Sequence, residues 1–463
     1  MSTTTASYMA CRLTVVCLFG LALSSQPAHA IDLAGAYRRA LSEDPAYQAA
    51  AADTEARREA IPQARAQFLP SISGSLMRSK NQTDQRSLSA TTPIDREYEY
   101  FSSNYAISLK QPIYRRYNFA LYQQAKSDVA SAEANLDRNL QDLAVRTANA
   151  YFDALMARYQ LELILSQKKT AQIQVTASVL AFEKGHGTRT DPDDAKARLK
   201  VLEAQEIQAR QNISYRHQQL ESIINEPVTS LAELDPSQMK PTLPIPTDLK
   251  EWTSKAEEVN PELVALRASV ESANQELEKA RAGHHPTVDL FVQRSQSQSE
   301  NNVSINNRYL TSQIGLQVNI PIFSGGGVSS QTRQARANIT KLEQQYEARR
   351  RDVAVQVRKE FQGVVEGAAR IDAISDAEKA AAQALESNKR SMQAGTRNLL
   401  DVFNAEQQLA STRRDLADAR IQYILSRLRL QALTGSSNEV EIEAVNAWLI
   451  DKTPTAGVHL SKH

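Results

Sequence analysis

The stretch QVNIPIFSGGGVSSQTRQAR, residues Gln317–Arg336, changes its structural period partway along. Up to Ile320, apolar and polar side chains alternate, which is typical of a half-buried strand. Pro321 lacks a backbone N–H and cannot continue a ladder, and the glycines after Ser324 allow a sharp corner. A helical pattern then continues for dozens of residues. The stretch therefore predicts a direct junction between a strand and a long helix.

A second junction of the same kind lies upstream. Alternation over residues 105–109 precedes QPIY, Gln111–Tyr114, and another long helical pattern follows. The first junction contains one proline and no glycine, so the two corners need not bend alike. The residues expected at the junctions are Pro112 in the first and Pro321, Gly325 and Gly326 in the second.

The two junctions belong to two copies of one unit of roughly 200 residues. The string at Leu33–Ala40 matches Leu249–Ala256 at a constant shift that also aligns the proline after each helix. A slightly smaller shift aligns the long helices and their return helices. We therefore divide the chain into a signal peptide (1–30), repeat one (31–235), repeat two (236–435) and a C-terminal tail (436–463).

Each copy reads helix, strand, loop, strand, long helix, glycine-containing turn and return helix. The long helices would span about 100 Å at 1.5 Å per residue, and their three-and-four apolar spacing is typical of a coiled-coil seam. In repeat one we expect helices over Leu33–Gln67, Arg116–Phe182 and Pro192–Ile224, and strands over Ser71–Met77 and Tyr105–Gln111. In repeat two we expect strands over 288–293 and 314–320, and helices over Gly326–Met392 and Leu400–Leu433.

The first 30 residues have the features of a secretory signal peptide. Arg12 precedes the apolar run Leu13–Leu23, and Ala28-His29-Ala30 offers a small-residue cleavage site. An N-terminal anchor helix is the alternative. Both cysteines lie in this segment, and lipidation of Cys17 is not expected because Val16 precedes it. The mature chain would therefore have no disulfide and no cysteine metal site.

Composition and motifs exclude several classes of function. The 54 basic and 53 acidic residues nearly cancel, which gives no support for nucleic-acid binding. The mean hydropathy of −0.46 is too polar for a bundle of membrane helices. There is no glycine-rich phosphate loop and no metal-spaced histidine set, and His284-His285 reads as a solvated corner before Pro286. We expect no cofactor, no metal and no enzyme activity.

Two hairpins provide four strands per chain, each with an apolar and a polar face. Four strands cannot close a barrel, because small membrane barrels start at eight. Three chains would supply twelve strands around a polar lumen. The alternative from patterning alone is a small soluble β-domain attached to a coiled coil. Aromatic residues near the strand ends would form a girdle: Tyr98, Tyr100, Phe101, Tyr105, Tyr114, Phe291, Tyr309 and Phe323.

Element order, duplication and local strings resemble the TolC family of outer-membrane efflux and secretion channels. The strings are ANAYF at Ala148–Phe152, PIFSGG from Pro321, and AGTR at Ala394–Arg397 followed by LDV at Leu400–Val402. The resemblance covers residues 31–435. It implies a mixed α and β homotrimer, in which a twelve-stranded outer-membrane barrel is continuous with a periplasmic α-helical tunnel. The proline-rich link between the copies, Glu226–Asp248, and the tail would form an equatorial collar.

The resemblance also implies a closed periplasmic entrance lined by acidic rings, which select cations. It places one ring on Asp401. The second acidic position of the family is Asn404 here, so the constriction is expected to be less negative than in that pattern.

A latch between neighbouring helix pairs is implied as well, with Arg397 bonding Thr190 and Asp191. Read without the family, Asp191-Pro192 would be a helix N-cap and a first helical residue. The gate is expected to be less tightly latched than in the family, because two of its other contacts are altered. The altered positions are Lys389, in place of an acid, and Met392, in place of a tyrosine, whereas Gln174 is retained.

The predicted function is a passive exit duct for type I protein secretion, multidrug efflux or both. Its partners would be a periplasmic adaptor, an inner-membrane ABC exporter or proton-driven pump, and outer-membrane lipid. The alternative is a periplasmic coiled-coil adaptor or scaffold that forms no pore. The duplication with two amphipathic hairpins favours the channel. Cargo is not specified by any motif.

Overall fold

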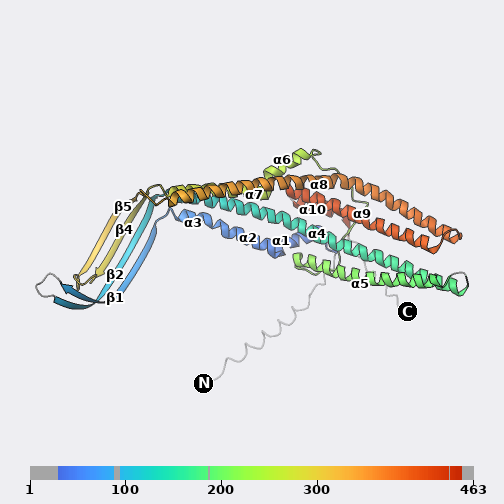
Figure 1. Cartoon of the computed structure of the whole chain (residues 1–463), viewed down its shortest axis with the longest axis horizontal. Helices are drawn as coiled ribbons and strands as arrows, with labels where there is room; N and C mark the ends of the chain where they lie inside the picture. The colour runs from blue at the N-terminus through green and yellow to red at the C-terminus, as the bar shows by residue number, and fades with distance from the viewer. Residues whose placement is uncertain (1–29, 88–93, 186–187, 437, 451–463) are drawn as a thin grey trace, which may run out of the picture.

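The computed structural model describes residues 30–87, 94–185, 188–436 and 438–450. Nearly all of the predicted signal peptide, and the tail after Ile450, lie outside the described residues. Four strands form a sheet at one end of an elongated molecule, and long helices run from it to two turns at the opposite end (Figure 1). Within the described part of the chain, no helix is both long enough and apolar enough to cross a membrane.

Repeat one contains more helices than the sequence suggested. The predicted helix over Leu33–Gln67 is wrong, since Asp44 interrupts it: its carboxylate accepts a hydrogen bond from the backbone N–H of Tyr47 (2.8 Å), and Pro45 opens the next helix. The elements are α1 (Leu33–Glu43), α2 (Pro45–Arg58), α3 (Ala60–Ala66), β1 (Ser71–Ser87), β2 (Ile94–Tyr114), α4 (Arg116–Glu183) and α5 (Thr190–Ile224).

Repeat two breaks its first helix at the equivalent place, where Asn260 caps the helix that begins at Pro261. The link before it contributes one short strand, which pairs with a short strand of the tail. From the link through repeat two to the tail, the elements are β3 (Glu233–Leu234), α6 (Leu249–Val259), α7 (Pro261–Ala282), β4 (Thr287–Gln298), β5 (Arg308–Asn319), α8 (Gly327–Gln393), α9 (Leu399–Leu433), α10 (Asn438–Asn446) and β6 (Leu449–Ile450).

The large sheet is antiparallel throughout and has the order β1-β2-β4-β5. The first hairpin is longer than the apolar alternation predicts: β1 and β2 have 17 and 21 residues, against 12 each in β4 and β5. Polar side chains support the extra pairs, as where the hydroxyls of Ser79 and Ser102 lie 2.7 Å apart. The first hairpin therefore projects beyond the second (Figure 1).

One face of this sheet is apolar and uncovered. Ile72 and Ile314, on the two edge strands, are 73% and 75% exposed, although large apolar side chains are rarely left this bare together. The opposite face carries mostly serine, asparagine, glutamine and threonine. The exposed apolar series comprises Ile72 and Leu76 on β1, Ile107 on β2, Val292 on β4, and Leu310, Ile314, Leu316 and Val318 on β5.

Four helices lie beside one another in each half of the helical region. Near the sheet, α4 packs against α2, α3 and α7, and α7 packs against α8. Toward the far end, α5 and α9 take over as partners of α4 and α8 (Figure 1). The core lies between these halves, where Tyr151, Phe152 and Tyr423 are completely buried. The Tyr151 hydroxyl donates to the carbonyl oxygen of Ala232 (2.8 Å), which ties α4 to the link.

The two strand-to-helix junctions have different structures. β2 runs on through Pro112 to Tyr114, with a register shift between these residues that bends the strand. Arg115 is the N-cap residue of α4, and its guanidinium donates two hydrogen bonds to the carboxylate of Asp289 on β4 (2.9 and 2.5 Å). Lys110 adds an ion pair to the same carboxylate (3.2 Å). Charged contacts with β4 thus fix the first corner.

The second junction depends on glycine. β5 ends at Asn319, before Pro321, and α8 begins at Gly327. Gly325 and Gly326 have φ angles of +60° and +80°, a region that side chains with a Cβ disfavour. The corner therefore requires glycine at these two positions.

We predict that Gly326→Ala lowers the stability of the folded protein by about 1–2 kcal/mol, because alanine at positive φ is strained. Gly327→Ala is the matched control. It is the first residue of α8, a Cβ there would meet nothing within 4 Å, and alanine favours the helix. Thermal unfolding in detergent, followed by circular dichroism, should show a lower midpoint for the first variant only. Equal midpoints would contradict the strained corner.

Candidate functional site

The two turns at the far end of the helices are built alike. α4 and α8 each end at a glycine with a φ angle of +77°, Gly185 and Gly395. The N–H of Gly185 donates to the carbonyl oxygen of Phe182, and that of Gly395 to the carbonyl oxygen of Met392 (both 3.0 Å). Left-handed glycines of this kind end helices and reverse the chain. The duplication has therefore preserved both helix ends.

The turn between α8 and α9 holds the predicted pore residue in a local hydrogen-bond pair. Asn398 caps α9: its side chain accepts from the N–H of Asp401 (2.9 Å), and its own N–H donates to the Asp401 carboxylate (3.2 Å). This reciprocal capping box fixes the orientation of the carboxylate. Arg397 lies 3.6 Å from the same carboxylate and is itself 56% exposed. Asn404, one turn further along α9, is exposed.

The turn between α4 and α5 uses Asp191 differently from the capping role that the sequence suggests. α5 begins at Thr190, two residues before the predicted start at Pro192, so Asp191 lies in the first turn and is not the N-cap. Its carboxylate accepts from the N–H of Thr188 (2.8 Å), while the hydroxyls of Thr188 and Thr190 lie 2.8 Å apart. The carboxylate therefore orders the turn that precedes its own helix.

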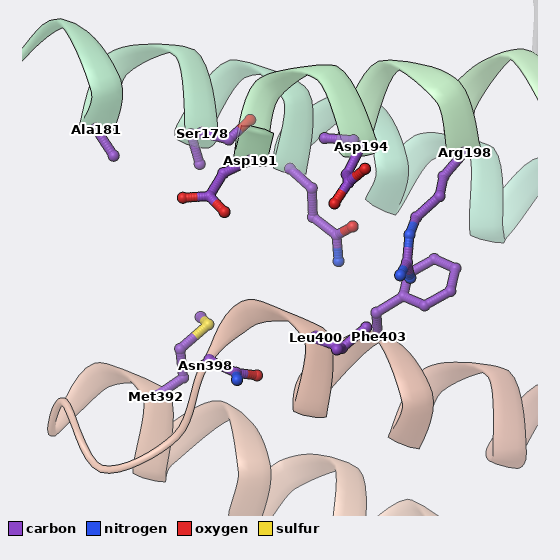
Figure 2. A pocket seen from close by; sticks show the side chains of 12 residues that line it. Ser178, Ala181, Asp191, Asp194, Arg198, Met392, Asn398, Leu400 and Phe403 are labelled. Atoms are coloured by element: carbon purple, nitrogen blue, oxygen red, sulfur yellow. The ribbon is translucent and has the colours of Figure 1, made fainter. Parts of the chain in front are cut away.

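A cavity of about 520 Å³ lies between the two turns of one chain. Figure 2 shows Asp191 and Asp194 pointing from one hairpin toward Met392 and Asn398 on the other. Gln174, which is buried in α4, also lines it. The cavity combines two carboxylates with the apolar side chains of Met392, Leu400 and Phe403. The two hairpins of one chain are therefore incompletely packed at their tips.

One contact crosses this cavity directly. The guanidinium of Arg198 on α5 lies over the ring of Phe403 on α9, 4.3 Å from its centroid (Figure 2). Cation–π contacts of this kind contribute about 0.5–1 kcal/mol at partly exposed sites. Sequence reasoning missed both residues, because they are separated by some 200 positions and belong to no shared motif. Their only signal was an aromatic side chain directly before Asn404.

The structure brings some predicted gate residues together and leaves others apart. Gln174, Asp191 and Met392 line the cavity between the hairpins. Lys389 pairs instead with Glu406 on α9 (3.5 Å), so its positive charge has a partner within its own hairpin. Arg397 and Asp401 contact each other. Contacts between neighbouring chains lie outside a single copy, so the predicted latch remains a prediction.

No group of three or more histidine, cysteine, aspartate or glutamate residues is arranged to hold a metal ion in the part of the chain that the structure describes. The geometry at the tips is that of a charged, incompletely packed contact between two helical hairpins.

Comparisons with known proteins identify the architecture. The model of the outer membrane efflux protein family matches residues 36–226 and 252–436, which covers both repeats. The alkaline protease secretion protein AprF of Pseudomonas aeruginosa is 32% identical over 447 residues, or 95% of this chain and 92% of that protein. The outer membrane protein TolC of Escherichia coli is 28% identical over 445 residues, or 93% of this chain and 87% of that protein.

The fold itself matches solved structures at much lower identity. The Campylobacter jejuni CmeC outer membrane channel superposes with a TM-score of 0.76 at 16% identity, covering 93% of this chain and 95% of that one. The predicted combination of four strands and long helices in each chain is confirmed. Because the family model spans both repeats, a channel is supported over a non-pore adaptor. The chain belongs to the outer membrane efflux protein family, the TolC family of non-enzymatic outer-membrane export channels that extend into the periplasm.

Proposed function

We propose that three copies of this chain close their sheets into one twelve-stranded barrel and form the exit duct of an export system. The observation that carries the proposal is the open sheet: within the described residues, β1 and β5 each pair with a strand on one side only. In lipid, every backbone polar group needs a partner, so an open edge is excluded. Pairing β1 of one copy with β5 of the next would satisfy both edges.

The dimensions of the sheet support a membrane-spanning role. Its shorter hairpin has strands of 12 residues, about 40 Å long at 3.3 Å per residue. With a tilt of about 40°, each strand rises about 30 Å, which is enough to cross an apolar band of about 25 Å. The uncovered apolar face would then contact lipid, and the polar face would line a water-filled lumen.

The helical region supports the same assembly. Each half of one copy presents four helices side by side, so three copies supply twelve around a common axis. The junction at Pro112 and Arg115, and the one at Pro321, Gly325 and Gly326, would join barrel to tunnel without a linker.

The direct test measures both assembly and conduction. Protein extracted from outer membranes in detergent should have the mass of three chains and should collapse to one chain on boiling. The same preparation should form ion-conducting pores in planar bilayers. A monomer without conductance would contradict the proposed channel.

We also propose that Arg397 acts as a latch at the tunnel entrance. Its guanidinium has five N–H donors, and in one copy it meets a single carboxylate at 3.6 Å. Asp191 and Thr190 lie at the equivalent end of the other hairpin. In a closed trimer Arg397 could bond to these residues of the neighbouring helix pair, and opening would return it to Asp401.

For this latch we predict that Arg397→Ser raises the resting conductance several-fold, because the neighbouring hairpins lose their charged contact. Arg390→Ser serves as the control, since Arg390 pairs with Glu386 on the exposed side of its own helix (3.1 Å). Single-channel recordings in planar bilayers measure both. Unchanged conductance in Arg397→Ser would reject the latch.

Asp401 is the proposed constriction residue, with Asn404 as its uncharged neighbour. In a trimer one carboxylate becomes a ring of three, which attracts cations. The capping box supports this role, because it holds the Asp401 side chain in one orientation. The aspartates at the other turn, Asp191 and Asp194, face the cavity between hairpins and would lie away from the constriction.

Asp401→Asn is predicted to reduce the preference for cations over anions while keeping the turn intact, since the amide oxygen can still accept the hydrogen bond from Asn398. Asp376→Asn is the control for loss of an exposed carboxylate on α8. Reversal potentials in asymmetric KCl give the ratio of permeabilities. A ratio equal to that of the unmodified protein would remove Asp401 from the ion path.

For cargo, we infer polypeptide export in the manner of type I secretion. Similarity to AprF, a protease secretion protein, over nearly the full length of both chains supports this choice. The chain would then work with an inner-membrane ABC exporter and a periplasmic adaptor that contacts the helix tips. Efflux of small compounds with a proton-driven pump is the second candidate, and the family description favours it.

A further inference from the structure

We propose that Arg78, Arg294 and Arg308 form a binding site for the phosphate groups of an anionic glycolipid in the outer leaflet of the membrane. The inference rests on the proposed barrel, because the barrel determines which face of the sheet contacts lipid. It concerns the outer surface of the sheet and does not involve the lumen or the gate.

The strand register places these arginines on the lipid-facing side. Residues alternate between faces along each strand, and cross-strand partners share a face. On β1 the outward positions Ile72 and Leu76 lead to Arg78. On β4 they are Val288, Leu290 and Val292, and Arg294 follows. On β5 they run from Val318 through Leu316, Ile314 and Leu310 to Arg308.

On three of the four strands, the row of apolar side chains on this face is thus followed by an arginine. On β5 the arginine comes at the outer end, since Arg308 is the first residue of the strand. A rise of about 30 Å for the whole strand puts Arg308 just beyond an apolar band of about 25 Å. That is the level of lipid phosphates, and Arg78 shares it because Ser103 and Gln298 connect the two residues across the sheet. Arg294 lies opposite Ser312, four residues further in than Arg308, so its long side chain would reach outward to the same level.

The three arginines lack protein counter-ions among the described residues. Arg294 lies opposite Ile107 and Ser312, and Arg308 lies opposite Gln298. Arg78 stacks over Phe101 at 5.5 Å, and none of the three forms an ion pair in the part of the chain that the structure describes. All three are exposed. Their guanidinium groups are therefore free to bind an external anion.

Two cations further out on the same face provide a contrast. Lys80 pairs with Glu99, and Arg86 pairs with Asp95, both at 3.4 Å. These residues belong to the part of the first hairpin that projects beyond β4 and β5, where carboxylates are available. Carboxylates of the protein therefore neutralise the positive charges that lie beyond the membrane. The three arginines that lie beside the membrane have no such partner among the described residues.

The free-energy cost of an unpaired arginine against lipid indicates that these three arginines have a binding partner. An arginine on the lipid face destabilises a barrel most at the bilayer midplane and less toward the interface. A long side chain reduces the cost by reaching toward the headgroups. A phosphate offers the guanidinium fork two parallel hydrogen bonds and an opposite charge. Lipid phosphate is therefore the partner that turns these three unpaired cations into a stabilising contact.

The proposal is tested with the purified full-length trimer and diphosphorylated lipid A as the probe. Native mass spectrometry should detect lipid A bound to the unmodified protein. In the R78Q/R294Q/R308Q variant the affinity should fall by at least about tenfold, since each arginine near a charged lipid surface contributes to attraction. Dephosphorylated lipid A should bind the unmodified protein as weakly as the intact lipid binds this variant.

The K80Q/R86Q variant is the matched control, because it removes two positive charges from the same face that already have carboxylate partners. It should bind like the unmodified protein. Equal lipid affinity in the triple variant, equal affinity for the dephosphorylated lipid, or an equal loss in the control would each overturn the site. The triple variant should still conduct in planar bilayers, which separates this test from that of the channel. Failure of the unmodified protein to conduct would overturn the barrel itself.

Discussion

Backbone N–H and C=O groups along the outer edges of β1 and β5 have no partner strand within the described residues of one chain. In water such edges would be solvated, but in lipid each unpaired group costs several kcal/mol. An apolar face that none of the described helices covers lies on the same sheet. Water would solvate the open edges but also the apolar face, whereas lipid would suit the apolar face but leave the edges unpaired. Pairing with neighbouring copies removes this conflict because it closes the edges. The fold of one chain is therefore completed only by others of its kind.

The duplication turns this requirement into a long conduit. Each copy of the repeat supplies one hairpin to the sheet and one pair of helices to the tip. Both junctions connect a strand to a long helix, but different residues form them. A charged cluster around Asp289 fixes the first, and left-handed glycines form the second. At the tips, the left-handed glycines are kept in both copies while the residues beside them differ. The two copies therefore share their architecture and differ in the side chains around the tip glycines.

Some of the structure could be predicted from sequence because it depends on local patterns. The long helices were predicted to within two residues at both ends, since their apolar spacing and glycine corners are local signals. The outer part of the first hairpin could not be, because Ser79 and Asn81 are strand residues only through their partners across the sheet. The predicted single helix over Leu33–Gln67 failed because the cap at Asp44 outweighed a continuous helical pattern.

For the candidate site, the sequence by itself determined the position of both turns, the residue types near them and the TolC family. The glycines, the capping residues and the strings around them act over only a few positions. Only the tertiary structure decided that Lys389 pairs with Glu406, that Arg198 lies over Phe403, and that three arginines share the apolar face of the sheet. Side chains from distant segments meet through packing and strand register, and neither is encoded in short-range spacing.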